Sequence, residues 1–383
     1  MSITRRHFGV SLAALGLAAC SNTSMPGPRG TVSVASGLPD DLKPAPNAAY
    51  DAWVASFRTR APAQGISPET LRVAFRGTGY LPGVVRRDRN QTEFKRSLED
   101  YLAIAVSDER VSKGQAAFAR HRSVLNALEA QYGVDAEIIT AIWGLESFFG
   151  ERKGDVPVIS ATSTLAFDGR RGAFFEKQLV AALQILENGD ITPSGMIGSW
   201  AGAMGHTQFI PTSYLAFAVD YTGDGRRDIW SEDPSDSLAS TAAYLARNGW
   251  TRGLRWGGEA GPGAPSGSEI QPQPGGPRFV VTSNFGVIKR YNNADAYAIG
   301  VGHLADRIGG GAPLRASFPP DEFGLTKDDR TRLQERLTAR GFDTGGTDGV
   351  IGPKSRGAIS DYQRSIGRPA TGDPSQELLR SLG

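Results

Sequence analysis

The chain has 383 residues, with 42 lysines and arginines against 40 aspartates and glutamates. This length suffices for one large domain and a small one, and six tryptophans indicate packed cores rather than disorder. A nearly neutral chain gives no electrostatic reason to expect a nucleic-acid partner. The four histidines are scattered without the spacing of a metal site.

The first twenty residues are typical of an export signal rather than of a folded domain. Residues 4–8 read T-R-R-H-F, which resembles a twin-arginine motif, and the apolar run after them is too short for a permanent membrane helix. The run ends in L-A-A-C, which resembles a bacterial lipobox, and Cys20 is the only cysteine in the chain. We therefore expect residues 1–20 to be a lipoprotein signal peptide that is lipidated at Cys20. The alternative is an ordinary secretory signal with a chance cysteine.

The residues around the lipobox also predict a location. Ser21, rather than an aspartate, follows Cys20, and resemblance to lipoprotein sorting rules then implies an outer-membrane protein that faces the periplasm. Removal of residues 1–19 would delete two arginines and no acids, which leaves 40 basic against 40 acidic residues. Residues 21–46 are rich in Ser, Pro, Gly and Thr and are expected to form a flexible tether.

The rest of the chain is mainly helical in pattern, with apolar residues at spacings of three and four. The segments with this spacing are Leu98–Ala105, Ala116–Tyr132, Asp135–Phe149, Phe174–Glu187, Ser237–Arg247 and Ala294–Ile308. A Gly/Pro-rich stretch at residues 258–277 precedes a strand-like segment, Arg278–Thr282, so we expect a small β insertion. The predicted organisation is a large domain over residues 47–310, a linker over 311–322 and a separate unit over 323–383.

Glu146 is the most informative residue of the large domain. It lies three residues after Trp143, four after Ile142 and seven after Ile139, so it falls on the apolar face of its helix. Desolvation on such a face raises the pKa of a carboxylic acid, and a neutral acid can protonate the leaving oxygen of a glycoside. The alternative is a buried structural ion pair with Arg120 or Arg152.

Residues 198–214, G-S-W-A-G-A-M-G-H-T-Q-F-I-P-T-S-Y, combine three glycines with amide, hydroxyl and aromatic side chains. Glycines allow close backbone approach, and the polar and aromatic groups suit a sugar, whose rings stack while its hydroxyls form hydrogen bonds. The alternative is a Gly-rich packing joint between a helix and a loop.

Five motifs together resemble the membrane-bound lytic murein transglycosylase B family, in its order and spacing over roughly residues 50–308. They are D-R-N-Q-T-E-F at residues 88–94, E-S-F-F-G, the Gly-rich segment above, D-G-R-R-D-I-W and N-F-G-V-I-K-R-Y-N. The resemblance implies a fold like that of goose-type lysozyme. It also implies cleavage of the MurNAc–GlcNAc β-1,4 bond of peptidoglycan without water, which leaves a 1,6-anhydroMurNAc end.

The resemblance assigns roles residue by residue. Glu146 matches the single catalytic acid and base of the family, and Ser199 and Gln208 match residues that line its sugar subsites. Three further residues match active-site tyrosines of the family: Tyr244, Tyr291 and Tyr297. The alternative is that each is an aromatic core residue with a satisfied hydroxyl.

The presence of only one suitable carboxyl group, that of Glu146, changes the reaction that is expected. Ordinary glycosidases place two carboxyl groups across the bond. Here the other nearby acids, Glu151 and Asp155, fall in a polar turn. A single Glu146 would protonate O4 of the departing GlcNAc and then accept the proton of the substrate's C6 hydroxyl, which attacks C1. No cofactor is required for this chemistry.

The segment from Asp220 resembles a calcium-binding loop, D-x-[ST]-x-D-G-x-x-D, with Ser231 where a glutamate is expected at position 12. A later acid, Glu232, Asp233 or Asp236, would have to replace that glutamate. A structural Ca²⁺ is one reading, and an Asx-rich turn with arginine counter-charges is the other. The expected ligand set is Asp220, Thr222, Asp224, Arg226, Asp228 and Asp236.

Residues 325–382 resemble the small three-helix peptidoglycan-binding domain, with the motif L-Q-E-R-L-T-A-R-G-F followed by D-G-V-I-G-P-K-S-R-G-A-I-S-D-Y-Q. Leu333, Leu337, Ile359 and Tyr362 are expected in its core. The alternative is a helical domain that contacts protein instead of cell wall.

The sequence thus predicts a lytic transglycosylase that binds peptidoglycan glycan strands and is held at the outer membrane by a lipid. It does not identify protein partners, although cell-wall synthesis or remodelling proteins are candidates. The alternatives are a hydrolytic muramidase and a non-catalytic wall-binding lipoprotein.

Overall fold

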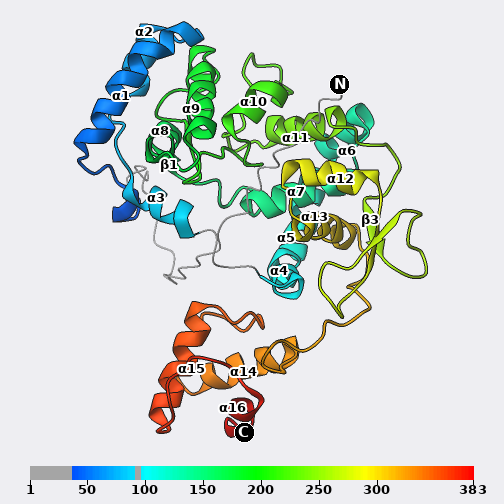
Figure 1. Cartoon of the computed structure of the whole chain (residues 1–383). Helices are drawn as coiled ribbons and strands as arrows, with labels where there is room; N and C mark the ends of the chain where they lie inside the picture. The colour runs from blue at the N-terminus through cyan, green and yellow to red at the C-terminus, as the bar shows by residue number, and fades with distance from the viewer. Residues whose placement is uncertain (1–36, 91–95) are drawn as a thin grey trace, which may run out of the picture. The chain divides into compact units, whose positions relative to one another are not determined.

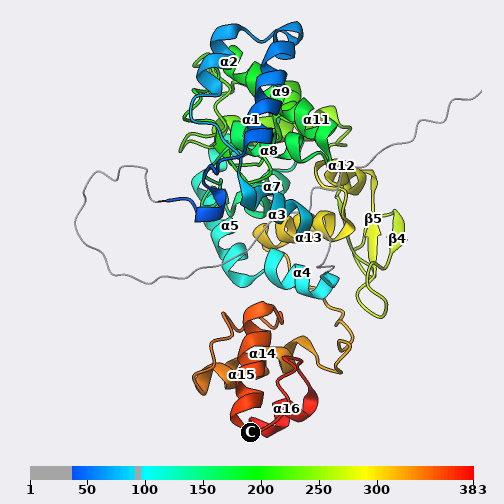
Figure 2. The same ribbon diagram turned by 60° about the vertical axis from the view of Figure 1, so that its left-hand side comes forward.

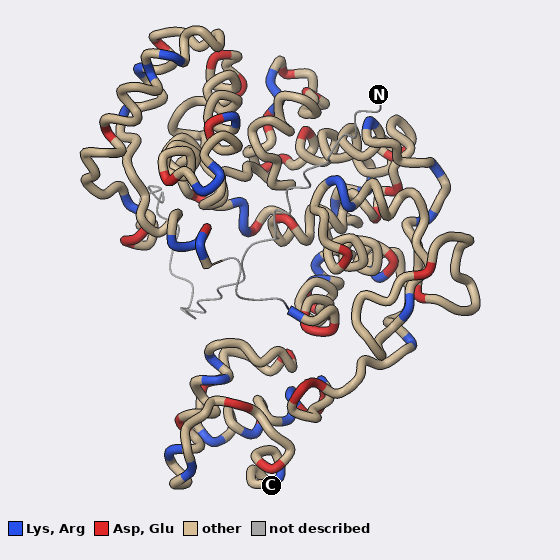
Figure 3. Tube along the Cα trace, viewed as in Figure 1, with Lys and Arg blue, Asp and Glu red and all other residues tan. Residues whose placement is uncertain are grey.

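The computed structural model describes residues 37–90 and 96–383. The predicted signal peptide, Cys20, most of the predicted tether and residues 91–94 of the first motif lie outside this described part. The described chain is mainly helical, as the sequence predicts (Figure 1), and it divides into two compact units. Basic and acidic residues are interspersed along it (Figure 3), and no described helix is long and apolar enough to cross a membrane.

Among the described residues, the unit that contains Glu146 comprises 37–90 and 112–253. Helix α5 (Asp108–Arg120) begins before this unit and ends within it. The other described elements of the unit are η1 (Asp40–Leu42), α1 (Ala48–Arg60), η2 (Ala61–Gln64), α2 (Pro68–Ala74), α3 (Pro82–Arg89), α6 (Arg122–Tyr132), α7 (Ala136–Ser147), β1 (Val156–Pro157), α8 (Val158–Asp168), α9 (Gly172–Glu187), β2 (Ile197–Gly198), α10 (Pro211–Phe217) and α11 (Ser235–Arg247).

The paired helices α8 and α9 support the Gly-rich segment. They pack side by side (Figure 1), and Leu165 and Phe175 on them are buried with Trp200 in one apolar cluster. Strand β1 leads directly into α8 and pairs antiparallel with β2, so that Val156 lies opposite Gly198. This short ladder fixes the start of the Gly-rich segment against the helices.

Helix α7 is buried over most of its surface because α6 and α11 pack against it. A helix that is apolar on nearly all sides is stable only in such an interior position. The sequence predicts it over Asp135–Phe149, and the structure has it at Ala136–Ser147. Asp135 is at the N-cap, but its side chain caps no described amide of the helix. The helix stops before Gly150 because Phe148 already has left-handed backbone angles (φ 53°, ψ 50°).

The long helix predicted over Ala116–Tyr132 is wrong in one respect. The structure divides this segment between α5 and α6 at His121, whose backbone leaves the helical region (φ −104°, ψ 18°). Apolar spacing continues across the break, which is why the pattern did not reveal it. His121 instead turns its ring edge toward Trp143 of α7, with ring centroids 5.4 Å apart.

The second unit comprises the described residues 96–111 and 254–383. It contains the predicted β insertion, an antiparallel sheet with the order β3-β5-β4 in which Val281 lies opposite both Gly257 and Ser268. Figure 2 shows β4 and β5 side by side. The elements of this unit besides the start of α5 are α4 (Leu98–Ala105), β3 (Gly257–Glu259), β4 (Ser268–Ile270), β5 (Phe279–Val281), α12 (Ser283–Tyr291), α13 (Asp295–Ile308), α14 (Lys327–Ala339), α15 (Pro353–Ser365) and α16 (Gln376–Ser381).

The three C-terminal helices enclose a small apolar core of their own. The four side chains predicted to lie in it are all buried: Leu333, Leu337, Ile359 and Tyr362. Helix α14 begins with a capping box, in which the Thr326 hydroxyl accepts from the Asp329 amide and the Asp329 carboxylate accepts from the Thr326 amide. Reciprocal capping fixes the helix start, and the core residues Leu333 and Leu337 follow about two and three turns later.

Candidate active site

Glu146 lies in the last turn of α7. The residues that share its predicted face, Ile139, Ile142 and Trp143, are buried, with at most 3% of each exposed. Glu146 itself is half-buried. The helix therefore carries the carboxyl group from an apolar interior to a partly accessible position, where it can meet a substrate.

The chain reverses direction directly after this helix, through two left-handed residues that are not glycines. Phe148 and Phe149 have φ values of 53° and 59°. Such angles cost about 1–3 kcal/mol per residue and persist only where the surroundings impose them. Here the Phe148 amide donates to Gly144 O (3.1 Å), and Lys113 and Arg152 each place a cation 4.5 Å from the centre of the buried Phe148 ring. The turn thus holds the end of α7 in one position.

The nearby acids differ from Glu146 in their surroundings. Glu151 is exposed and both of its carboxylate oxygens accept from Lys113 Nζ at 2.8 Å. Asp155 is exposed as well. The polar turn predicted for them is therefore present, and neither is placed like Glu146 at the end of a buried helix. Arg152, one of the two cations considered as ion-pair partners of Glu146, is exposed and lies over Phe148.

The glycines of the Gly-rich segment allow close approach between parts of the protein's own backbone. A side-chain Cβ at Gly198 would overlap with the carbonyl of Ala203, and one at Gly205 (φ 71°) would overlap with the carbonyl of Ile229. Tight hydrogen bonds close the same loop, since the Ser199 amide donates to Ala203 O at 2.8 Å. These glycines build a packed joint, which then presents polar side chains.

Gln208 and Ser199 are the polar side chains that this joint presents. Gln208 has a left-handed backbone (φ 52°), and its amide nitrogen donates to Lys153 O (3.0 Å) and Gly205 O (2.9 Å). Both amide hydrogens are thereby used, so the side-chain oxygen is fixed in direction and is the atom that can accept from a ligand. The Ser199 hydroxyl accepts from the Ala203 amide (3.1 Å), which leaves its hydrogen to donate.

The three tyrosines lie on helices of both units. Tyr244 is on α11, 9% exposed, and its ring packs against Phe209 and Phe217 with centroid distances of 5.9 and 4.7 Å. This contact joins α11 to the residue after Gln208. In the other unit, Tyr291 ends α12 and is half-buried, and Tyr297 lies in the first turn of α13 and is 1% exposed.

His206 connects the Gly-rich segment to α7, a role that the sequence analysis missed. Its ring nitrogen Nδ1 accepts from the Trp143 indole (3.1 Å), and its carbonyl accepts from the Ser147 hydroxyl (2.5 Å). The ring nitrogen Nε2 lies 2.7 Å from Ser231 O. The only signal in the sequence was its position two residues before Gln208, because spacing along the chain cannot show a bond across 63 residues.

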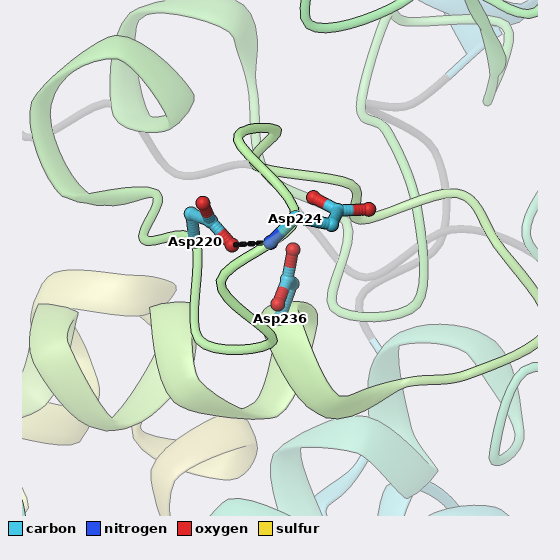
Figure 4. A group of neighbouring side chains, drawn as sticks. All are labelled: Asp220, Asp224 and Asp236. Carbon is cyan, nitrogen blue, oxygen red and sulfur yellow. Dashed lines mark hydrogen bonds between the residues drawn. The ribbon is translucent and has the colours of Figure 1, made fainter.

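Three acids of the predicted calcium loop come together (Figure 4). One carboxylate oxygen from each of Asp220, Asp224 and Asp236 lies within 4.8 Å of the others. Asp220 and Asp224 are exposed and Asp236 is 2% exposed. Among the acids considered for position 12, the structure thus places Asp236, from the first turn of α11, in the group.

Backbone amides hold these carboxylates in place. Asp236 Oδ1 accepts from the amides of Tyr221 and Thr222, both at 3.0 Å, and its Oδ2 accepts from the Asp228 amide at 2.9 Å. Burial nevertheless raises the pKa of Asp236, and the backbone hydrogen bonds only partly oppose this effect. The buried carboxylate is therefore a costly charge unless another group compensates it.

The remaining predicted ligands are placed less directly. The Asp228 carboxylate lies outside the three-acid group and accepts from the amides of Trp230 (2.9 Å) and Ser231 (3.0 Å). Thr222 hydrogen-bonds Asp236 through its side chain, and Arg226 is exposed.

Arg227, offered as an alternative counter-charge for the acids, pairs elsewhere. Its guanidinium donates to both carboxylate oxygens of Asp190, at 3.2 and 2.6 Å, and lies 5.0 Å from the Tyr214 ring centre. The Asp190 pair raises the pKa of the Arg227 guanidinium. This arginine therefore braces the loop from outside and does not neutralise the three-acid group.

A mainly helical lysozyme-like unit, with one acid at the end of a buried helix and a small helical domain after it, defines a class of glycan-cleaving proteins. The chain matches the family described as "Transglycosylase SLT domain" over residues 49–264 and 263–306, and a "Putative peptidoglycan binding domain" over residues 326–382. The chain belongs to this transglycosylase family.

Similar proteins agree with this membership. The chain is 42% identical to SltB3 from Pseudomonas aeruginosa, solved in complex with NAG-anhNAM-pentapeptide, with a TM-score of 0.68 and coverage of 88% of this chain and 100% of that one. It is 26% identical to the lytic transglycosylase Slt35 of Escherichia coli, solved in complex with calcium, with a TM-score of 0.58 and coverage of 69% and 94%.

A curated relative covers a shorter region. Membrane-bound lytic murein transglycosylase B of Escherichia coli is 35% identical over 167 residues, which are 42% of this chain and 45% of the relative. The aligned region thus spans less than half of that relative's length. The mainly α, lysozyme-like fold and the peptidoglycan-binding domain expected from the sequence are confirmed by the family and the solved structures.

Proposed function

We propose that the chain is a peptidoglycan lytic transglycosylase. In this proposal it cleaves the MurNAc–GlcNAc β-1,4 bond without water and leaves 1,6-anhydroMurNAc ends. The observation that carries the proposal is the position of Glu146, half-buried at the end of an apolar helix in a chain 42% identical to SltB3, whose complex contains an anhydroMurNAc glycan. A groove that only holds glycan has no need of a partly desolvated acid, which disfavours the non-catalytic alternative.

Glu146 transfers a proton in both halves of the reaction, first as the acid and then as the base. As a carboxylic acid it donates to O4 of the departing GlcNAc, and the bond between C1 and O4 breaks. The resulting carboxylate accepts the proton of the MurNAc C6 hydroxyl while O6 forms the bond to C1, so Glu146 ends as it began. The attack is intramolecular and gains the effective concentration of a tethered nucleophile. The exposed, ion-paired Glu151 is not suited to activate a water instead.

The polar side chains of the Gly-rich segment orient the sugar in this proposal. The Gln208 oxygen, fixed by two donated hydrogen bonds, is suited to accept from a sugar N–H or O–H group, and Ser199 is suited to donate. Tyr244 is suited to orient the sugar through its ring and hydroxyl, and the family resemblance also assigns sugar-binding roles to Tyr291 and Tyr297. The three C-terminal helices hold the enzyme on the wall, as their match to a peptidoglycan-binding domain suggests.

We further propose that Asp220, Asp224 and Asp236 hold a structural Ca²⁺. Three carboxylates gathered within 4.8 Å supply the oxygen ligands that this ion prefers, and the Slt35 relative was solved with calcium. The ion would offset the buried charge of Asp236 and brace the loop, with Thr222 and Arg226 as the further ligands named by the sequence motif, whereas the Asp228 carboxylate lies outside the group and accepts from backbone amides. It takes no part in the proton transfers assigned to Glu146.

The location of the protein is also a proposal. The T-R-R-H-F and L-A-A-C motifs support twin-arginine export, lipidation of Cys20 and an outer-membrane lipoprotein that faces the periplasm. The curated relative is named as membrane-bound, in agreement with an envelope location. Cell-wall synthesis or remodelling proteins remain candidate partners.

Analysis of the products tests the reaction. Digestion of purified sacculi should release muropeptides with anhydro ends, each lighter by one water than the product of lysozyme. Reducing ends would assign the chain to the hydrolytic muramidases, and no cleavage by the folded protein would favour a binding module.

Glu146→Gln tests the role of the acid. The amide keeps the shape of the side chain but cannot donate the proton, so turnover should fall by several orders of magnitude while glycan binding is retained. Turnover at about a tenth of the wild-type rate would exclude Glu146 as the acid.

A further inference from the structure

His206 bonds to α7 on both sides of Glu146. Trp143, three residues before the acid, donates its indole hydrogen to His206 Nδ1, and Ser147, the residue after the acid, donates its hydroxyl hydrogen to the His206 carbonyl. The Ser147 hydroxyl also accepts from the Gly150 amide at 2.9 Å, within the left-handed turn. His206 of the Gly-rich segment therefore contacts the last turn of α7, which carries Glu146, through two hydrogen bonds.

His206 is also held from its other side, by the chain segment between Asp224 and Asp236 of the three-acid group. The His206 amide donates to Ile229 O at 3.1 Å, and Nε2 lies 2.7 Å from Ser231 O. Because Nδ1 accepts the indole hydrogen and a carbonyl can only accept, Nε2 carries the ring proton and donates it to Ser231. Burial also lowers the pKa of His206, which agrees with a neutral ring.

Packing leaves the ring little freedom to move. His206 is 4% exposed, and its ring lies edge-on to Trp143 with centroids 5.7 Å apart. On another side the ring packs against Gly150, where an added Cβ atom would lie only 2.6 Å from His206 Nδ1. The neighbouring charged side chains are Lys153 and Glu232, which affect the His206 pKa in opposite directions. The ring is therefore a fixed acceptor aimed at the catalytic helix.

We propose that His206 is a positioning residue, which sets the position of Glu146 through Trp143 and Ser147 without touching the substrate. This inference rests on the proposed role of Glu146 as the acid. Misplacement of a catalytic group by about 1 Å can cost about 100-fold in rate. Loss of the Nδ1 acceptor should consequently lower kcat while KM, which reflects the sugar contacts of Gln208 and Ser199, changes little.

The experiment compares substitutions that separate the acceptor from the packing. His206→Leu introduces an apolar side chain of similar size that offers no acceptor. We expect its kcat to fall about 10- to 100-fold, with a KM within about threefold of the wild-type value. His206→Asn can place an acceptor oxygen near the Nδ1 position, so it should recover much of the lost kcat. Trp143→Phe removes the donor from the other side of the same bond and should also lower kcat.

A double-mutant cycle identifies the bond itself. If Trp143 and His206 act through one hydrogen bond, Trp143→Phe with His206→Leu should be no slower than the slower single variant. Independent, multiplying losses would overturn the proposal, and so would a folded His206→Leu protein with wild-type kcat. If His206→Leu does not fold, Trp143→Phe and His206→Asn provide the test. A wild-type kcat in both of these variants would overturn the positioning role of His206.

The controls separate this inference from the proposed function. Each variant is checked by its melting temperature and by glycan binding before rates are compared. Anhydro products from the wild-type protein and an inactive Glu146→Gln protein test the proposed function, whatever the His206 variants do. A failure of the positioning role would therefore leave the assignment of the acid intact.

Discussion

Calcium should raise the melting temperature of the protein through the three-acid loop. The carboxylate oxygens of Asp220, Asp224 and Asp236 lie within 4.8 Å of one another, so each pair repels by about 1 kcal/mol in a water-like dielectric. The same pairs repel by about 3–4 kcal/mol at an effective dielectric constant of 20, closer to the surroundings of the buried Asp236. A bound divalent cation removes this repulsion in the native state only.

The expected shift follows from binding linkage. Asp236, which would replace the glutamate of position 12, lies later in the chain than Ser231, the residue at that position. This displacement indicates weak affinity, with a Kd of about 0.1–1 mM. Calcium at 10 mM would then stabilise the native state by about 1.4–2.7 kcal/mol. For a domain of this size, that corresponds to an increase of about 3–10 °C in melting temperature over the protein in chelator.

Asp224→Ala should abolish that increase. In chelator the variant should melt within about 2 °C of the wild type, because relief of repulsion offsets loss of the bond that Asp224 Oδ1 accepts from the Arg226 amide (2.9 Å). The matched control is Glu232→Ala, which removes a fully exposed charge close to the loop but outside the three-acid group. Scanning calorimetry or fluorimetry in calcium and in chelator measures each difference.

The reasoning would be refuted by equal wild-type melting temperatures in calcium and chelator, or by a calcium shift that survives in Asp224→Ala. Activity provides a separate readout. Because the proposed ion would brace the loop and take no part in proton transfer, sacculus digestion at moderate temperature should continue after chelation.

Two further predictions concern the start of α7 and the chain terminus. Burial and the nearby Glu129 and Glu137 raise the pKa of Asp135 from 3.8 to about 6, so the folded state binds its proton more tightly and gains stability as pH falls through this window. Asp135→Asn should therefore melt about 2–4 °C above the wild type at pH 7.5 and lose that advantage below pH 3.8, and a constant difference across pH would contradict this cause. Cys20→Ala should lose lipid labelling and leave the membrane fraction with its activity intact, whereas unchanged sedimentation with membranes would show that something other than a lipid holds the protein.

The sequence predicted the elements that local patterning controls. Helix α4 has the bounds expected from its apolar spacing, and the core of the C-terminal helices contains the four side chains named for it. Break points were harder, since the non-helical His121 and the left-handed Phe148 are each imposed by packing rather than by a turn-forming residue. Local preference favours helix at both positions, and tertiary contacts override it.

The helix that carries Glu146 and the Gly-rich segment were predicted separately, but the hydrogen bonds between them were not. Motif resemblance named Glu146 and Gln208, yet nothing in the spacing of residues indicated that His206 would accept from Trp143 across 63 positions. Likewise, the loop motif named six ligands, while the structure gathers three acids and turns Asp228 toward the Trp230 amide. Such contacts depend on which loops the buried helices bring together, and that is a property of the whole domain.

Backbone strain shows how that domain serves the site. Among the described residues, the non-glycines with positive φ are Phe148, Phe149 and Gln208, and all three follow within a few residues of Glu146 or His206. At about 1–3 kcal/mol each, these conformations would relax in an isolated segment. They are maintained because α7 is buried, because two cations enclose Phe148, and because Gln208 donates both amide hydrogens to backbone carbonyls. Strain confined to the two segments that present the acid and the amide indicates that stability of the helical scaffold is used to fix their geometry, as a reaction with a single proton-transferring group requires.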